Sequence, residues 1–193
     1  MARPTEVTRT TKSIHVPLGH AGQLLVPGRV VKSAETRLAY QVERFLGEGG
    51  FGQAYRAARV GRSGTVPDTV CIKVSPHMDG WLREAYFGQL LGAHPRAIRV
   101  YDAFPLLRGE DRPLYCLALE YARHGDLLAC LLRDSGGWSE AAARREIAGI
   151  LEVLGTLHRG QLLHRDLTPM NVFVCDDRKL KLSLSSCQGC HSR

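Results

Sequence analysis

Between residues 38 and 119, short apolar segments alternate with turns that contain glycine, proline or charged residues. Alternation of apolar and polar residues over four to eight positions is typical of strands. The predicted strands are 38–46, 53–57, 70–74, 98–104 and 114–119. A helix over residues 79–91 is expected between the third and the fourth strand.

The pattern becomes helical after residue 126. Asp126 is a suitable N-cap for a helix over 127–133, and Ser139 for a helix over 140–158. In the second helix, apolar residues cover an arc of roughly 160°, wider than the ~100° stripe of a surface helix. These residues are Ile147, Ile150, Leu151, Val153, Leu154 and Leu157. Such a helix is expected to be covered from more than one side. Segments 172–174 and 180–182 then predict a hairpin.

Residues 1–38 are polar, and glycine or proline breaks each short apolar run. The apolar runs at 24–26 and 30–31 are candidates for a short strand added to the following sheet. We interpret the segment as an extension or linker without chemistry of its own. Its first twelve residues lack the apolar core of a secretory signal.

Composition narrows the class of protein. The chain has 193 residues, 44% of them hydrophobic, and no apolar run approaches the ~18 residues that span a bilayer. Most of the six cysteines lie in apolar segments, which favours reduced thiols in a cytoplasmic protein. The net charge of +7 comes from arginines that are spread along the chain without a basic cluster, so nucleic-acid binding is not expected.

A glycine-rich segment lies between the first two predicted strands. Gly47, Gly49 and Gly52 match G-x-G-x-x-G. In a dinucleotide fold this motif opens a helix, whereas here it joins two strands, as in a lid over ATP phosphates. Without side chains, backbone N–H groups can approach phosphates closely. An ordinary glycine hairpin is the alternative.

Lys73 lies inside the apolar strand 70–74. A buried ammonium requires an anionic partner, unless the lysine lies on the solvent face of an edge strand. Glu84 in the following helix can supply the carboxylate.

The segment from His164 to Asn171 carries the clearest chemistry. Asp166 precedes Asn171 by five residues, so Asp166 can accept a hydroxyl proton while Asn171 turns an amide oxygen towards a metal ion. Taken alone, the segment could be a polar turn between a helix and a strand.

These motifs, with a hinge-like segment at 119–126, occur in one order over residues 40–182 and resemble the protein kinase family, close to bacterial serine/threonine kinases. The resemblance implies an α+β, two-lobed fold: an antiparallel β small lobe with helix C, and an incomplete helical large lobe. The implied division is 1–38 extension, 39–122 small lobe and hinge, 123–182 partial large lobe, and 183–193 aberrant tail.

The resemblance also implies the roles of individual residues. Asp166 would be the catalytic base, Lys73 and Glu84 would hold the phosphates, Arg165 would bind a phosphorylated activation loop, and Asn171 would bind Mg²⁺. Leu119 would be the gatekeeper, the backbone of Glu120 and Ala122 would bind adenine, and Asp126 would face the ribose. The other implied ATP-binding residues are Gly47, Glu48, Gly49, Gly50, Phe51, Gly52, Ala54 and Cys71.

Three positions depart from the family pattern. Ala54 replaces a valine that roofs the adenine, and Thr168 replaces a lysine near the base. Leu184 occupies the place of the D-F-G aspartate, the second metal ligand. Asp176 and Asp177 are predicted about 13 Å away, at the far end of the hairpin, and cannot substitute.

The last residues change character after Leu182. Cys187, Cys190 and His191 match a haem-attachment pattern and supply part of a zinc site, but neither site is expected. We interpret this change as the result of a shifted reading frame near Leu182 or of a truncated gene.

The family implies ATP-dependent phosphorylation of protein serine or threonine, impaired in this chain, with ATP as ligand and an incomplete Mg²⁺ site. The alternatives are an inactive nucleotide- or partner-binding fragment (a pseudokinase) and a small-molecule kinase. The protein substrate and the oligomeric state do not follow from the sequence. Poor solubility is expected from the apolar arc of the 140–158 helix.

Overall fold

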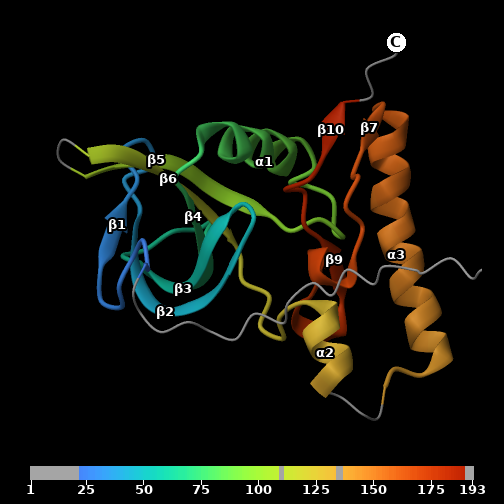
Figure 1. Ribbon diagram of the computed structural model, residues 1–193. Helices are drawn as coiled ribbons and strands as arrows, with labels where there is room; N and C mark the ends of the chain where they lie inside the picture. The colour runs from blue at the N-terminus through green and yellow to red at the C-terminus, as the bar shows by residue number, and fades with distance from the viewer. Residues whose placement is uncertain (1–21, 109–110, 134–136, 190–193) are drawn as a thin grey trace, which may run out of the picture.

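The computed structural model describes residues 22–108, 111–133 and 137–189. Figure 1 shows two parts next to each other: a β-sheet with helix α1 packed on it, and helices α2 and α3 with several short strands. We call the first part the small lobe and the second the large lobe. The expected α+β, two-lobed fold, with an antiparallel β small lobe and a partial helical large lobe, is confirmed.

The small lobe is built on one six-stranded sheet. Its strands are β1 (Val30–Lys32), β2 (Ala39–Gly49), β3 (Gly52–Val60), β4 (Thr69–Ser75), β5 (Val100–Arg108) and β6 (Asp111–Glu120). They lie in the order β1-β2-β3-β4-β6-β5, and every neighbouring pair is antiparallel. All five predicted strands are present. The strands predicted over 98–104 and 114–119 extend further towards each other, because the β5–β6 ladder continues to the pair Arg108 and Asp111.

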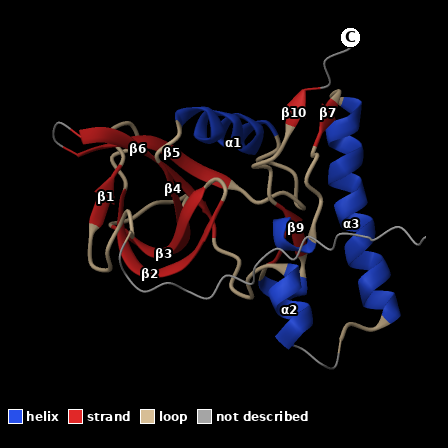
Figure 2. Cartoon of the chain, in the orientation of Figure 1, coloured by secondary structure: helices blue, strands red, loops and turns tan. Residues whose placement is uncertain are grey.

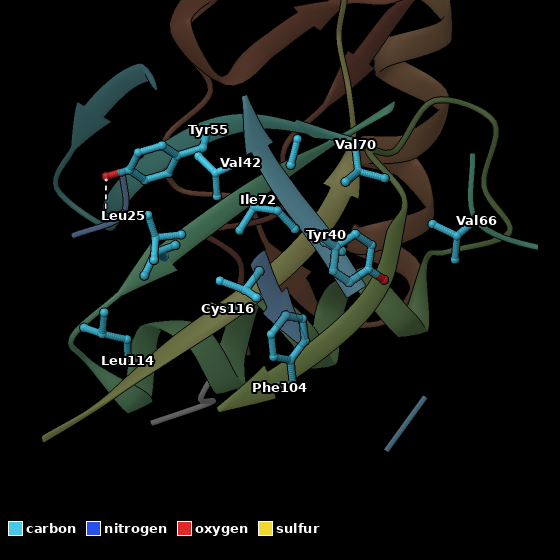
Figure 3. Close-up of a cluster of buried hydrophobic side chains, with 14 residues drawn as sticks. Leu25, Tyr40, Val42, Tyr55, Val66, Val70, Ile72, Phe104, Leu114 and Cys116 are labelled. Carbon is cyan, nitrogen blue, oxygen red and sulfur yellow. Dashed lines mark hydrogen bonds between the residues drawn. The ribbon is translucent and has the colours of Figure 1, made fainter. Parts of the chain in front are cut away.

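Alternating residues of these strands point to one face and form the small-lobe core. Tyr40, Val42, Tyr55 and Ile72 are each at most 1% exposed, and Figure 3 shows them converging with Phe104. This period-two burial is the reason that the strands could be predicted from the sequence.

Part of the N-terminal extension packs against the small lobe. Strand β1 pairs with β2, and Leu25 and Val31 belong to the small-lobe core. The buried carboxylate of Asp102 on β5 accepts hydrogen bonds from the hydroxyls of Ser33, Thr36 and Tyr40. The proposed domain boundary at residue 38 therefore separates two segments that share one core.

Helix α1 (Met78–Leu90) packs on the sheet, within one residue of its predicted range. At Gly88 a Cβ would lie 2.0 Å from a methyl carbon of Val100 on β5. Glycine therefore permits the close approach of this helix to the strand, which places Glu84 above the sheet.

In its described residues the large lobe carries two α-helices, two short 3-10 helices (η1 and η2) and four short strands; Figure 2 colours these elements by type. Its elements are α2 (Leu127–Arg133), α3 (Glu140–Arg159), β7 (Leu162–Leu163), η1 (Pro169–Asn171), β8 (Val172–Val174), η2 (Asp176–Arg178), β9 (Leu180–Leu182) and β10 (Gln188–Gly189). Strands β8 and β9 form the predicted hairpin. Ser139 caps α3 by accepting a hydrogen bond from Ala142 N, as expected.

The tail beyond Leu182 is part of the fold as far as it is described. Strand β10 pairs with β7, and Leu184 and Cys187 belong to the large-lobe core with Leu157 of α3. Cys190 and His191 lie outside the described residues. The five cysteines within the described residues are free thiols. Burial raises the pKa of the Cys187 thiol to about 11.

Helix α3 buries only part of its apolar arc. Ile150, Val153 and Leu157 face the large-lobe core, whereas Ile147 and Leu151 are 54% and 61% exposed. Across residues 22–108, 111–133 and 137–189, no helix has the length and apolarity required to cross a bilayer.

Candidate active site

The glycine-rich hairpin is formed by the adjoining ends of β2 and β3. Gly49 and Gly52 form its last backbone pair. Gly52 has φ = +119°, and a Cβ there would lie 2.2 Å from the carbonyl oxygen of Val74. At Gly47 and Gly49 a Cβ would meet nothing within 4 Å, so packing does not require these two glycines. An open backbone at both positions fits close contact with a ligand such as a phosphate.

Lys73 and Glu84 form an ion pair beside this hairpin. The Lys73 Nζ lies 2.5 Å from Glu84 Oε2, and the two side chains are only 17% and 7% exposed. The ring of Phe51, at the turn of the hairpin, lies 5.4 Å from the same ammonium. The structure thus brings together three predicted site residues and points a lysine, held by a buried carboxylate, towards the glycine-rich turn.

An apolar cluster spans the two lobes next to this ion pair. Cys71 of β4 pairs with Leu119 of β6, and both pack in one cluster with Ala122 and Phe173. Burial raises the pKa of the Cys71 thiol to about 12, so the thiol is neutral and acts as an apolar surface. The cluster thus brings together the predicted site residues Cys71, Leu119 and Ala122.

Phe173 was not predicted as a site residue. Its strand, β8, follows Asn171 directly, and Phe173 forms an isolated backbone bridge with Asp126. Because strand residues alternate in direction, the half-buried Phe173 lies between the buried Val172 and Val174 and faces away from them. This alternation is the sequence signal that could have identified it.

The hinge residues have well-defined backbone and side-chain partners. The carbonyl of Ala122 accepts a hydrogen bond from Gly125 N, and the Glu120 carboxylate binds Lys181 Nζ at 2.6 and 2.8 Å. Asp126 Oδ1 accepts a hydrogen bond from Ala129 N at 2.8 Å. Asp126 is therefore engaged as the N-cap of α2, the structural role that its position predicts.

The loop from His164 to Asn171 brings the predicted base and metal ligand together. Asn171 Nδ2 donates to the Asp166 backbone oxygen and to Asp166 Oδ2, both at 2.8 Å. Ser186 Oγ also donates to Asp166 Oδ2, at 3.4 Å. The carboxylate of Asp166 is thus oriented by two donors, and Asn171 keeps its amide oxygen turned away from Asp166.

Two neighbours of Asp166 bind the tail. The buried His164 places Nε2 2.6 Å from the Ser183 carbonyl oxygen. Arg165, in the left-handed region at φ = +63°, donates to Gln188 Oε1 at 2.6 Å. Arg165 therefore has a partner within this chain, because β10 places Gln188 beside it. The half-buried Thr168 accepts the Asn171 backbone N–H through its own carbonyl.

Leu184 lies where the D-F-G carboxylate is expected, and its environment is apolar. Ser183 N donates to the Asn171 carbonyl at 2.9 Å, so this segment runs beside Asn171 as predicted. Leu184 itself is 3% exposed and belongs to the large-lobe core. Asp176 lies in η2, where it pairs with Arg123.

The potential metal ligands near Asp166 do not form a complete magnesium site. Mg²⁺ requires an octahedral set of oxygen ligands, commonly including one or two carboxylates. The side-chain groups around Asp166 that could bind a metal ion are its own carboxylate, the Asn171 amide oxygen and the Ser186 hydroxyl. Within the described ranges, no three histidine, cysteine, aspartate or glutamate side chains gather into a potential metal site.

The fold, the glycine-rich hairpin, the lysine–glutamate ion pair and the Asp–Asn loop together define a protein kinase domain. The family model of the protein kinase domain matches residues 40–183. The chain therefore belongs to the protein kinase family, whose members use ATP and a divalent metal.

Its relatives include serine/threonine kinases. CBL-interacting protein kinase 20 of Oryza sativa subsp. japonica is 31% identical over 148 residues, covering 72% of this chain and 30% of that protein. Serine/threonine-protein kinase B of Synechocystis sp. is 31% identical over 154 residues, covering 74% and 26%. Serine/threonine-protein kinase SBK2 of Mus musculus is 28% identical over 173 residues, covering 86% and 46%. The chain thus spans less than half the length of each of these relatives.

Proposed function

We propose that this chain binds ATP as a serine/threonine protein kinase domain and that its phosphate-transfer step is impaired. The observation that carries the first part is the buried ion pair between Lys73 and Glu84 at the base of the glycine-rich hairpin. A lysine held in this way is a preorganised partner for phosphate oxygens. The five free thiols in the described ranges support action in a reducing cytoplasm.

The residues that would hold ATP lie in three groups. Cys71, Leu119 and Phe173 would pack against the adenine, with the hinge backbone at Glu120 and Ala122 as its hydrogen-bonding edge. The backbone of residues 47–52 and Lys73 would hold the phosphates. Bound ATP would supply the phosphoryl group, and Asp166 would accept the proton of a serine or threonine hydroxyl.

The second part of the proposal depends on Leu184. Most of the barrier to phosphoryl transfer is lowered by positioning and by neutralisation of charge, to which metal ions contribute. Position 184 offers no oxygen ligand and is buried in the large-lobe core. Of the two large-lobe metal ligands that the family uses, only Asn171 would then be present. The same observation favours a second candidate function, a protein that binds nucleotide without transferring phosphate.

Two measurements on the purified chain test the proposal. Titration of a fluorescent ATP analogue should show binding that magnesium strengthens little. Incubation with radiolabelled ATP and a generic protein substrate should show at most weak labelling, and Asp166→Asn is the control. Absence of binding with and without magnesium would contradict the nucleotide site. Strong labelling that Asp166→Asn abolishes would contradict the impaired transfer step.

A further inference from the structure

One buried side chain, that of Gln53, joins the N-terminal extension to the glycine-rich hairpin. Gln53 follows Gly52 on β3 and is only 4% exposed. It lies opposite Glu48 in the β2–β3 ladder, one position before the final pair Gly49 and Gly52. A glutamine is rarely buried unless its amide is fully hydrogen-bonded.

The Gln53 amide forms four hydrogen bonds. Oε1 accepts from Leu24 N at 2.8 Å and from the Tyr55 hydroxyl at 2.5 Å. Nε2 donates to the Gly22 carbonyl at 3.0 Å and to Glu48 Oε2 at 3.3 Å. Two donors and two acceptor sites are the complete capacity of a primary amide. Gln53 therefore binds the backbone of the extension on one side and the hairpin on the other.

A second contact closes this network. Leu25 N donates to the Tyr55 hydroxyl at 3.1 Å (Figure 3), and the side chain of Leu25, 1% exposed, fills the small-lobe core. The extension is thus held by backbone hydrogen bonds at residues 22, 24 and 25 and by one apolar anchor.

The position of Gln53 couples this network to the nucleotide side of the sheet. Along β3, Gln53 and Tyr55 are buried in the small-lobe core, while Ala54 between them points to the opposite face. Ala54 lies directly opposite Lys73 in the β3–β4 ladder. The hydrogen bonds that hold the Gln53 side chain therefore also hold the neighbouring backbone. Ala54 and the last glycine pair, Gly49 and Gly52, lie on this stretch of backbone.

We propose that Gln53 is a positioning residue of the nucleotide site, and that residues 22–25 are a structural part of that site. This inference rests on the proposed nucleotide binding. The network holds the end of the glycine-rich hairpin in one conformation, so that less conformational freedom is lost when phosphates bind. The extension then contributes to affinity although none of residues 22–25 belongs to the predicted nucleotide contacts.

The test compares three variants of the full chain. Gln53→Ala removes the network. Gln41→Ala removes an exposed glutamine from β2 of the same hairpin, and Val42→Ala weakens the small-lobe core without touching the network. The readouts are the affinity for a fluorescent ATP analogue, amide hydrogen exchange of residues 45–52 relative to β6, and the unfolding midpoint in urea.

Gln53→Ala should bind the analogue about three- to tenfold more weakly, which corresponds to the loss of one or two net hydrogen bonds. Exchange of residues 45–52 should accelerate more than that of β6. Gln41→Ala should match wild type, and Val42→Ala should lower the midpoint without the selective acceleration. Val42→Ala could instead cause the same weaker binding and the same selective exchange as Gln53→Ala at an equal loss of stability. In that case Gln53 would have only a structural role, and the inference would be overturned.

A rescue experiment adds a second criterion. Gln53→Glu replaces the donating amide by a carboxylate that faces Glu48, so it should also weaken binding. Adding Glu48→Gln restores a donor between the two positions and should recover part of the affinity; no recovery would contradict the proposed link. If wild type binds no nucleotide, the proposed function fails, and the exchange measurement alone then decides whether Gln53 positions the hairpin.

Discussion

At the scale of single residues, Leu184 combines a chemical loss with a structural gain. The side chain cannot bind a cation, but it packs in the large-lobe core. We predict that Leu184→Ala lowers the free energy of unfolding by about 2–5 kcal/mol, the usual cost of deleting a buried leucine side chain. Urea denaturation measures this loss.

The matched control is Leu163→Ala, because Leu163 is 36% exposed on the neighbouring β7. It should cost less than about 1 kcal/mol, as is usual for substitutions near the surface. Equal losses in the two variants would show that Leu184 is not part of a packed core.

Lys73 and Glu84 allow stability and binding to be separated. Lys73→Met leaves the Glu84 carboxylate buried without its partner, so stability should fall by about 3–5 kcal/mol. The double variant Lys73→Met with Glu84→Met replaces the ion pair by apolar side chains and should recover most of that loss. Neither variant should regain affinity for the ATP analogue, because the phosphate-binding charge is absent in both.

The measurements are urea unfolding and analogue titration, with Lys32→Met as a control for an exposed lysine of the same sheet. A double variant that binds the analogue as tightly as wild type would refute the assigned role of Lys73.

The sequence predicted those site residues whose chemistry is local. Lys73 stood out as a charge inside an apolar strand, and Asp166 with Asn171 formed a spaced polar pair. Gln53 gave no such signal, and Phe173 showed only the alternation of a short strand. A glutamine at the start of a strand is usually solvated, and its four partners come from positions up to 31 residues away in the chain. Phe173 looked like one more core residue of a hairpin.

At the scale of elements, periodicity predicted the strands of the small lobe and the helices α1, α2 and α3 to within a few residues. It could not predict β10, because a two-residue strand carries no period and its pairing with β7 spans some twenty-five residues. Which apolar residues of α3 are buried also could not be predicted from the sequence. Six apolar residues marked a wide arc, but only the packed fold separates the buried Leu157 from the exposed Leu151.

The contact between α3 and the β8–β9 hairpin includes a buried ion pair. Arg96 binds Glu146 of α3, and Glu146 Oε2 also accepts from Leu180 N at 3.1 Å. Burial acts to raise the pKa of Glu146, but hydrogen bonds from Arg96 and Leu180 outweigh it, so the pKa lies below its ordinary value of 4.5. The folded chain therefore releases this proton more readily than the unfolded chain.

This sign gives a prediction on pH. Well above pH 4.5 the Glu146 carboxylate is ionised in both the folded and the unfolded chain, and its stabilising effect is complete. As pH falls towards the lowered pKa, the unfolded chain takes up the proton first, so stability is lost. Glu146→Gln should be less stable than wild type at pH 7 by about 1–3 kcal/mol. It should lose less of its remaining stability between pH 5 and pH 3.

Urea unfolding at several pH values measures both curves. Glu152→Gln is the control, because Glu152 is exposed on the same helix. Parallel curves for wild type and Glu146→Gln would contradict the assignment of the acid sensitivity to Glu146.

At the scale of the whole molecule, several links join the two lobes. Ile98 N donates to the Leu182 carbonyl and Leu182 N to the Arg96 carbonyl, so the segment after α1 pairs with β9. Lys181 of β9 binds Glu120 at the end of β6. These contacts surround the apolar cluster of Cys71, Leu119 and Phe173. The surface that would hold adenine is thus built where the lobes are tied together.

The large lobe also exposes apolar side chains that the fold does not use. Ile147 and Leu151 lie one turn apart on α3 and are each more than half exposed. Leu131 and Leu132 of α2 are 52% and 79% exposed. Apolar groups that remain in water favour association between molecules, because their burial is worth roughly 25 cal/mol per Å². We therefore predict that the chain self-associates as its concentration rises.

The double variant Ile147→Lys with Leu151→Lys should shift the chain towards monomer while leaving its unfolding midpoint nearly unchanged, because neither side chain supports the core. Sedimentation velocity over a range of concentrations measures the shift. The control is Arg144→Lys with Arg145→Lys, which conserves the charge of the same helix and should leave association unchanged. A wild-type chain that stays monomeric at high concentration would contradict the prediction. A double variant that associates as wild type does would instead place the contact elsewhere, with Leu131 and Leu132 of α2 as the next positions to substitute.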